Sequence, residues 1–262
     1  MRNVKFILFL LIVLSIGCNS DTSEKKQEET PAEDTVMEVP VSVPDFKVQE
    51  YHLPDELPYI RQKFDFLYQK FYPIGWSQSG YFAYISEPVD EACGCYFFEL
   101  IIQNMVTDKV SYRFSFNDQG AGETLKSVWD KKQTMFAKKL SEYSIVQDGG
   151  FKLAPESFEY SQQKYSIKYK TRMEKDSDFM LDLVKQYKIN LVRGSTTKIV
   201  CDEQIPKNDA ILNLIVSGVV TSPYENRIAI VVQEERRGFE GPPNILNFRL
   251  IGSNLEKGFE NK

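Results

Sequence analysis

Three cysteines in the body of the chain are the residues best suited to chemistry. Cys93 and Cys95 flank Gly94 in the stretch DEACGCYFFELII, and Cys201 lies much later in the chain. A zinc site needs about four ligands, so it would have to use all three cysteines with one carboxylate or His52. The C-x-C spacing is short for such a site, and we predict no bound metal.

Disulfide chemistry offers two further readings of the same residues. A bond between Cys93 and Cys95 would close a small ring suited to a redox device. A structural bridge to Cys201 is favoured if the protein lies in an oxidising compartment. Cys95 begins an apolar run and can be buried as a small hydrophobe, whereas Cys93 lies in a loop. We therefore prefer a Cys93–Cys201 bridge, with Cys95–Cys201 or no pairing at all as alternatives.

No motif in the sequence names a catalytic reaction. His52 is the single histidine of the chain, which excludes histidine clusters. A catalytic triad of the Ser-His-Asp or Cys-His type would have to use this one residue at the edge of the domain. The chain has no P-loop, no G-x-G-x-x-G and no H-E-x-x-H motif. Many acids are present, but none is singled out as a catalytic pair. We expect no cofactor, and we leave the enzyme question open with a preference for a non-enzyme.

The N-terminus has the composition of an export signal. Arg2 and Lys5 precede the apolar run Phe6 to Leu14, which is short for a membrane-spanning helix. The ending Ser15-Ile16-Gly17-Cys18 resembles the lipobox of bacterial lipoproteins, although that family prefers Leu, Val or Ile where Ser15 stands. An ordinary signal peptide cut near Gly17 is the alternative.

The lipoprotein resemblance implies an anchor and a location. In that family the cysteine, here Cys18, becomes the first residue of the mature chain and carries palmitate-type acyl chains, which together hold a protein firmly on a membrane. Asn19 follows, whereas aspartate there is the usual signal for retention in the inner membrane. The resemblance thus implies an envelope protein of the outer membrane, and leaves open whether it faces the periplasm or the cell surface.

Residues 18–50 have the composition of a disordered acidic tether. Residues 19–50 carry nine acids against three lysines and have no aromatic before Phe46. Such a segment cannot bury enough apolar surface to offset its ordering entropy. We predict a signal peptide at 1–17, the lipidated cysteine and tether at 18–50, and a single domain at 51–262. This domain is nearly neutral, which argues against nucleic acid as a partner.

Hydrophobic periodicity predicts a mainly β fold with one amphipathic helix. Alternating or apolar runs predict strands over 81–85, 95–103, 110–116, 165–173, 179–191, 197–201, 211–220, 227–234 and 245–251. Apolar residues at spacings of three, four and seven predict a helical insert over 124–143 with Thr124 as N-cap. Residues 51–74 fit either a strand or one short helix.

Two stretches form a weak internal repeat. GWSQSGYFAYISE (75–87) and VTSPYENRIAIVVQE (220–234) each place a serine and a turn before a strand with a central alanine, Ala83 or Ala229. A loop and a second apolar strand follow each of them. The W-S-x-S-G-x-F-A-Y opening resembles blades of TolB-like or WD-type β-propellers, and also a poorly characterised group of predicted secreted bacterial proteins. The resemblance implies antiparallel β-meanders as blade-like units, in an incomplete or small propeller-like arrangement.

The loops that follow the two repeats are our candidate recognition surface. Glu87, Asp90 and Glu91 make the first loop acidic, and Arg236, Arg237 and Phe239 lie in the second. If the two units pack side by side, both loops emerge at the same end, and binding residues often lie on loops held by a rigid scaffold. We therefore expect a non-enzymatic module that binds a protein or a glycan, with a carboxylate-based envelope hydrolase as the alternative.

Overall fold

The computed structural model describes residues 49–61, 65–91, 93–120, 122–177, 180–239 and 241–261. The predicted signal peptide, Cys18 and the tether up to residue 48 lie outside these residues. The described part forms β1 (Leu67–Tyr68), β2 (Lys70–Trp76), β3 (Tyr81–Glu87), β4 (Tyr96–Asn104), β5 (Lys109–Asp118), α1 (Leu125–Glu142), β6 (Val146–Gln147), β7 (Ser157–Tyr160), β8 (Gln163–Asp176), β9 (Leu181–Arg193), β10 (Thr196–Gln204), β11 (Ile211–Thr221), β12 (Arg227–Arg236), β13 (Ile245–Asn254) and β14 (Glu260–Asn261). The predicted mainly β fold with one helix is confirmed.

The strands form three sheets, which we name by position. The helix-side sheet has the order β5-β4-β3-β2-β6, the central sheet β1-β13-β12-β11, and the outer sheet β14-β10-β9-β8-β7. All pairings are antiparallel except β1 with β13, which is parallel. The region left undecided between strand and helix contains β1 and β2, and Pro73 in β2 lies at a register shift, where a missing N–H is tolerated.

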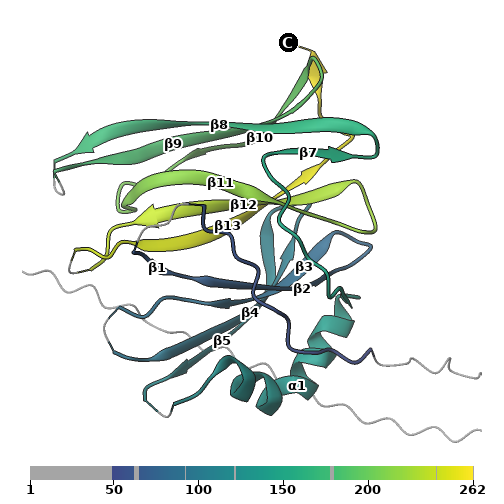
Figure 1. The fold of residues 1–262 in the computed structure, drawn as a ribbon, viewed down its shortest axis with the longest axis vertical. Helices are drawn as coiled ribbons and strands as arrows, with labels where there is room; N and C mark the ends of the chain where they lie inside the picture. The colour runs from purple at the N-terminus through teal and green to yellow at the C-terminus, as the bar shows by residue number, and fades with distance from the viewer. Residues whose placement is uncertain are drawn as a thin grey trace, which may run out of the picture. The chain divides into compact units, whose positions relative to one another are not determined.

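Each apolar core lies between two neighbouring layers (Figure 1). In β12, Ile228, Ile230 and Val232 pack towards the outer sheet, whereas Ala229 and Val231 pack towards the helix-side sheet. The same alternation occurs in β3, whose Phe82 and Tyr84 face the central sheet while Ala83 and Ile85 face the helix. The resulting order of layers is outer sheet, central sheet, helix-side sheet and α1.

The helix forms where it was predicted and for the predicted reasons. Thr124 is the N-cap: its side chain accepts from the backbone N–H of Ser127, and the Ser127 side chain accepts from that of Thr124. The buried face of α1 carries Val128, Trp129, Phe136 and Leu140, which pack on the helix-side sheet. The stripe of apolar residues is therefore a core-packing face.

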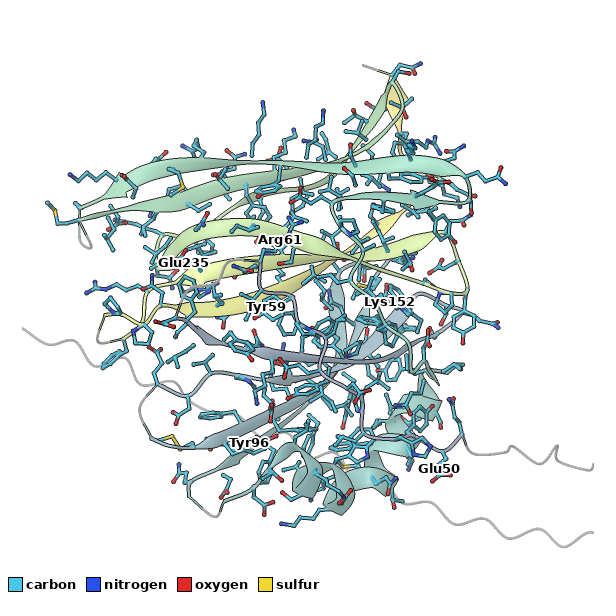
Figure 2. All side chains as sticks on the ribbon, in the orientation of Figure 1. Glu50, Tyr59, Arg61, Tyr96, Lys152 and Glu235 are labelled. Carbon is cyan, nitrogen blue, oxygen red and sulfur yellow. A yellow bond between two sulfur atoms is a disulfide. The ribbon has the colours of Figure 1, made fainter. Side chains whose placement is uncertain are left out.

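The N-terminal segment 49–61 ties the layers together. The Tyr51 hydroxyl donates a hydrogen bond to the carbonyl of Ile145 (2.6 Å), which follows α1 in the chain. Tyr59 is buried between two sheets and donates to the carbonyls of Gln69 (2.8 Å) and Leu246 (3.0 Å). Arg61 reaches the carbonyl of Val216 in the central sheet (2.9 Å). Figure 2 labels Tyr59 and Arg61 along this segment.

No helix in the described residues is long and apolar enough to cross a membrane. The described residues also contain no closed propeller, because the three sheets stack as layers. The two units expected to pack side by side are the helix-side sheet and the central sheet, which share one core.

Lys198 in β10 is held in a cationic corner of the fold. Its Nζ donates to the carbonyl oxygens of Asn254 and Lys257, and the Phe259 ring centroid lies 5.4 Å away. Burial, followed by the charges of Arg227 and Arg193, lowers the pKa of Lys198 to about 8 from 10.5. Between about pH 8 and pH 10.5, Lys198 is therefore still protonated in the unfolded chain but has lost its proton in the folded chain.

We expect this difference to appear as a rise in stability with pH. Between about pH 8 and 10 the free energy of unfolding should increase for the native protein, since the unfolded state binds more protons. Lys198→Met should lose that contribution to the slope. The measurement is urea denaturation across this range. Equal slopes for the two proteins would show that the folded-state pKa of Lys198 is not lowered.

Candidate functional site

The two repeat units have equivalent hydrogen bonds at their turns. In the helix-side sheet, Met105 donates its N–H to the carbonyl of Gly80 (2.9 Å), and in the central sheet Leu255 does the same to Asn226 (2.7 Å). The asparagines that end β4 and β13 also correspond. The Asn104 side chain accepts from Val106 and Thr107, and the Asn254 side chain accepts from Glu256 and Lys257. The turn after β4 and the turn after β13 therefore have the same pattern of hydrogen bonds.

The turn ends of the two units contact each other directly. Arg227 donates to the carbonyl of Met105 (3.1 Å), and the N–H of Gly252 donates to the carboxylate of Asp108 (2.6 Å). A Cβ built on Gly252 would lie 1.9 Å from the carbonyl oxygen of Met105. Glycine is thus required where the central sheet meets the turn of the helix-side sheet.

The opposite ends of the units bring the two predicted recognition loops together. The backbone N–H of Phe239 donates to the Glu91 carboxylate at 2.6 Å. Gly238 is buried in this junction, where an added Cβ would lie 2.4 Å from the carbonyl oxygen of Gly241. We call the β3–β4 loop (88–95) and the β12–β13 loop (237–244) together the loop end. The expectation that these loops emerge at one end agrees with this contact.

Two of the predicted recognition residues are held within the fold. The Glu87 side chain is buried and accepts from the Tyr72 hydroxyl (2.5 Å) and from Lys70 (3.1 Å). Burial, and then the hydrogen bond to Glu87, raises the pKa of Tyr72 well above its usual range. Arg236 forms ion pairs with Asp209 and Glu234. These contacts fix the positions where β3 and β12 pass into their loops. Glu87 and Arg236 therefore stabilise the loop end and do not line its pocket.

Asp90 organises the cysteine loop, and the cysteine pairing differs from the preferred prediction. Its carboxylate accepts from the N–H of Cys93 (3.1 Å) and of Cys95 (2.7 Å). The structure joins Cys93 to Cys95, and Cys201 is a free cysteine. Cys201 lies in β10 of the outer sheet, packed against the core between the outer and central sheets. The loop cysteines belong to the helix-side sheet, on the other side of the central sheet, so the predicted Cys93–Cys201 bridge is not formed.

This pairing makes a direct prediction for thiol labelling. In unfolded, unreduced protein, Cys201 should react with a thiol reagent, whereas Cys93 and Cys95 should react only after reduction. Mass spectrometry of the labelled peptides distinguishes the three positions. In protein that carries Cys18→Ser, the further change Cys201→Ser should abolish labelling before reduction. Protection of Cys201 in the unfolded, unreduced protein would instead show a bridge to that residue.

An apolar pocket of about 320 Å³ opens beside the second loop. Its lining residues are Leu181, Leu212, Arg237, Gly241, Pro242 and Asn244. Phe239, between two of these residues in the chain, is 83% exposed, and Met180 next to Leu181 is 69% exposed. An exposed arginine in an apolar hollow, with an exposed aromatic and an exposed methionine next to its lining residues in the chain, forms a surface that can bind an apolar group next to a negative charge.

The sequence did not reveal the contribution of the outer sheet to this site. Met180 and Leu181 lie at the tip of the β8–β9 hairpin, and Met180 has a φ of 55°. The sequence predicts a strand through both, which would hide one of them. A run of three apolar residues between acids in DSDFMLD is the only local signal in the sequence that a turn exposes them.

A second cavity, of about 450 Å³, lies where the N-terminal segment crosses residues 147–151. Its charged and titratable lining residues are Glu50, His52, Asp55, Glu56 and Asp148, beside apolar residues such as Phe151. His52 is exposed, and its backbone N–H donates to the side chain of Gln147 (2.7 Å). In the described residues no group of three or more His, Cys, Asp or Glu side chains could hold a metal ion.

Comparison with known proteins adds no relative. No protein-family model, no curated protein and no solved structure matches this chain.

Proposed function

We propose that this protein is a lipid-anchored protein of the bacterial envelope whose folded part is a non-enzymatic binding module. The lipobox-like ending at Cys18 and the acidic composition of the following segment support the anchor. Asn19 favours the outer membrane. Acyl chains on Cys18 would hold the domain at the membrane, and the segment up to residue 50 would act as a spacer.

Metabolic labelling tests the anchor separately from the binding site. Cells grown with a clickable palmitate analogue should label the native protein, and Cys18→Ser should abolish the label. A matched Cys201→Ser variant should keep it. Label retained in Cys18→Ser would contradict the proposal, because acylation would then lie elsewhere in the chain.

The loop end is the proposed binding surface, and the exposure of Phe239 beside an apolar pocket is the observation that carries it. Aromatic and arginine side chains in such settings dominate binding energy at protein interfaces. The pocket lining is mostly apolar, which favours a protein segment over a glycan, since a glycan needs many polar partners. We infer a partner segment with an apolar side chain near a carboxylate that Arg237 can bind.

Site-specific photo-crosslinking in cells tests this surface. A benzoylphenylalanine at position 239 should yield a discrete adduct, whereas the same probe at Val110, which is also exposed but in the helix-side sheet, should not. Arg237→Ala should weaken the adduct at 239, because the partner's carboxylate loses its ion pair. Equal adduct yields from both positions, or an adduct at position 239 whose yield is unchanged by Arg237→Ala, would contradict the proposal.

The finer architecture is also part of the proposal. The three sheets stack face to face, as successive propeller blades do, and two of them have equivalent turns. This supports blade-type units in an open, incomplete arrangement, similar to the TolB-like repeats that the sequence resembles.

A carboxylate-based hydrolase remains the second candidate, because the 450 Å³ cavity gathers four acids and the only histidine. Its substrate would be an envelope glycan or peptide. Turnover of such a substrate by purified protein, lost in Asp148→Asn without a change in melting temperature, would support this function. Turnover that survives Asp148→Asn would place any activity outside this cavity.

A further inference from the structure

The outer sheet has one covered face and one open face. Tyr165 and Ile167 of β8 are buried against the central sheet, and the residues alternating with them point the other way. Among the described elements, none covers that second face, and α1 packs on the far side of the molecule against the helix-side sheet. In Figure 2, side chains with nitrogen at their tips project from β8 away from the central sheet.

The open face carries a row of lysines. Lys164, Lys168 and Lys170 are exposed, and none of them forms an ion pair with a described residue. The cross-strand neighbour of Lys170 is Lys188, whose charge is offset by Asp202 (3.1 Å). Lys170 itself therefore faces a like charge across the strands, an arrangement that does not stabilise the sheet. Glu159, opposite Lys164, is the one acid beside the row on β7.

The helix offers an internal comparison. It is also rich in lysine, but Lys126, Lys131 and Lys139 each form an ion pair with a nearby acid. Three of the five helix lysines thus form ion pairs, whereas Lys164, Lys168 and Lys170 on the open face of β8 form none with a described residue. The folded domain as a whole is nearly neutral, so the positive charge of the open face comes from how the lysines are placed and not from an excess of lysine in the domain.

We propose that this open face binds the anionic surface of a phospholipid bilayer. A flat face bearing several lysines matches a flat, negatively charged surface, and each lysine near such a surface strengthens binding. Ile199, 58% exposed, lies on the same face and can enter the headgroup layer. The outward residues of β8, β9 and β10 include no aromatic on which nucleotide bases could stack, which favours lipid over single-stranded nucleic acid.

The inference does not depend on the binding surface at the loop end, to which the outer sheet contributes only the tip of the β8–β9 hairpin. It adds an orientation: with this face on the membrane, the outer sheet is the layer next to the lipid. The attraction would act within about 10 Å of the surface and weaken as salt is added.

Vesicle binding tests the proposal without the lipid anchor. The mature chain from residue 18 carrying Cys18→Ser contains the whole compact unit Phe46–Lys262. It should sediment with vesicles of phosphatidylcholine mixed with phosphatidylglycerol, but not with phosphatidylcholine alone. The triple variant Lys164→Gln/Lys168→Gln/Lys170→Gln should lose binding by roughly 100-fold, about fivefold for each lysine.

A variant of equal charge separates the face from net charge. Lys126→Gln/Lys132→Gln/Lys138→Gln changes three exposed helix lysines and should retain most of the binding. Circular dichroism and the melting temperature should match for all three proteins. An equal loss in both variants, or equal binding to neutral vesicles, would overturn the proposal. Single-stranded DNA bound as tightly as the anionic vesicles, with the same lysine dependence, would overturn the choice of lipid.

Discussion

Gly252→Ala is expected to lower the free energy of unfolding by about 3 kcal/mol, at the upper end of the usual overpacking cost. The new Cβ would lie 1.9 Å from the carbonyl oxygen of Met105, and all three of its nearest neighbours are backbone atoms that no rotamer change can move. The same shift would disturb the hydrogen bond from Gly252 N–H to Asp108. The two sheets would therefore have to separate locally at their turn ends.

Urea denaturation of Gly252→Ala, beside Gly149→Ala, measures this effect. Gly149 has no atom within 4 Å of an added Cβ and no positive φ, so its alanine variant should stay close to the native protein. Because glycine is the more flexible residue when unfolded, that control can even be slightly more stable. A Gly252 variant as stable as the control would show that the turn of the helix-side sheet does not press on β13.

Phe71→Ala should cost about 3–5 kcal/mol, the usual range for a fully buried phenylalanine. Phe71 is fully buried in the core between the helix-side and central sheets, and its ring lies 5.6 Å from Tyr84 and 4.7 Å from Phe248. Removing the ring leaves a cavity bordered by other rigid rings, which cannot collapse to fill it. Much of the attachment between these two sheets depends on this aromatic cluster.

The measurement is again equilibrium unfolding, with the unfolding slope compared as well as the midpoint. Val110→Ala is the control, because Val110 lies in the same sheet but is 44% exposed, and it should lose well under 1 kcal/mol. If Phe71→Ala lost no more than Val110→Ala, the interface between the two sheets would not contribute to the cooperative core. A lower slope would instead show that the sheets come apart separately.

The sequence predicts the local elements well and their stacking poorly. Alternation in 165–173 and the apolar run in 227–234 identify β8 and β12, and Thr124 marks the start of α1, because these signals are local. Residues 51–74 fit a strand or a helix equally, because β2 is buried on both faces and so lacks the alternation of a half-buried strand. Which face of β12 meets which sheet depends on contacts between residues far apart in the chain, and no local pattern records them.

The candidate site shows the same division. The internal repeat was enough to predict that the loops around Glu91 and Phe239 share one end, since equivalent strands place equivalent loops together. The repeat does not indicate that the Glu87 carboxylate is bound by Tyr72 and Lys70. It also does not indicate that the tip of the β8–β9 hairpin, at Met180 and Leu181, contributes to the site from another sheet. The cysteine pairing was missed because Cys201 belongs to the third sheet of the stack.

The place of the central sheet in the stack also has a consequence for the order of assembly. Its strands β11, β12 and β13 come from the last part of the chain, yet they fill the middle layer and supply one side of two cores. Until residues 211–254 have been synthesised, the helix-side sheet can pack only against α1, and the outer sheet has no apolar layer to pack against. Formation of both cores that the central sheet completes is thereby delayed until the chain is nearly complete.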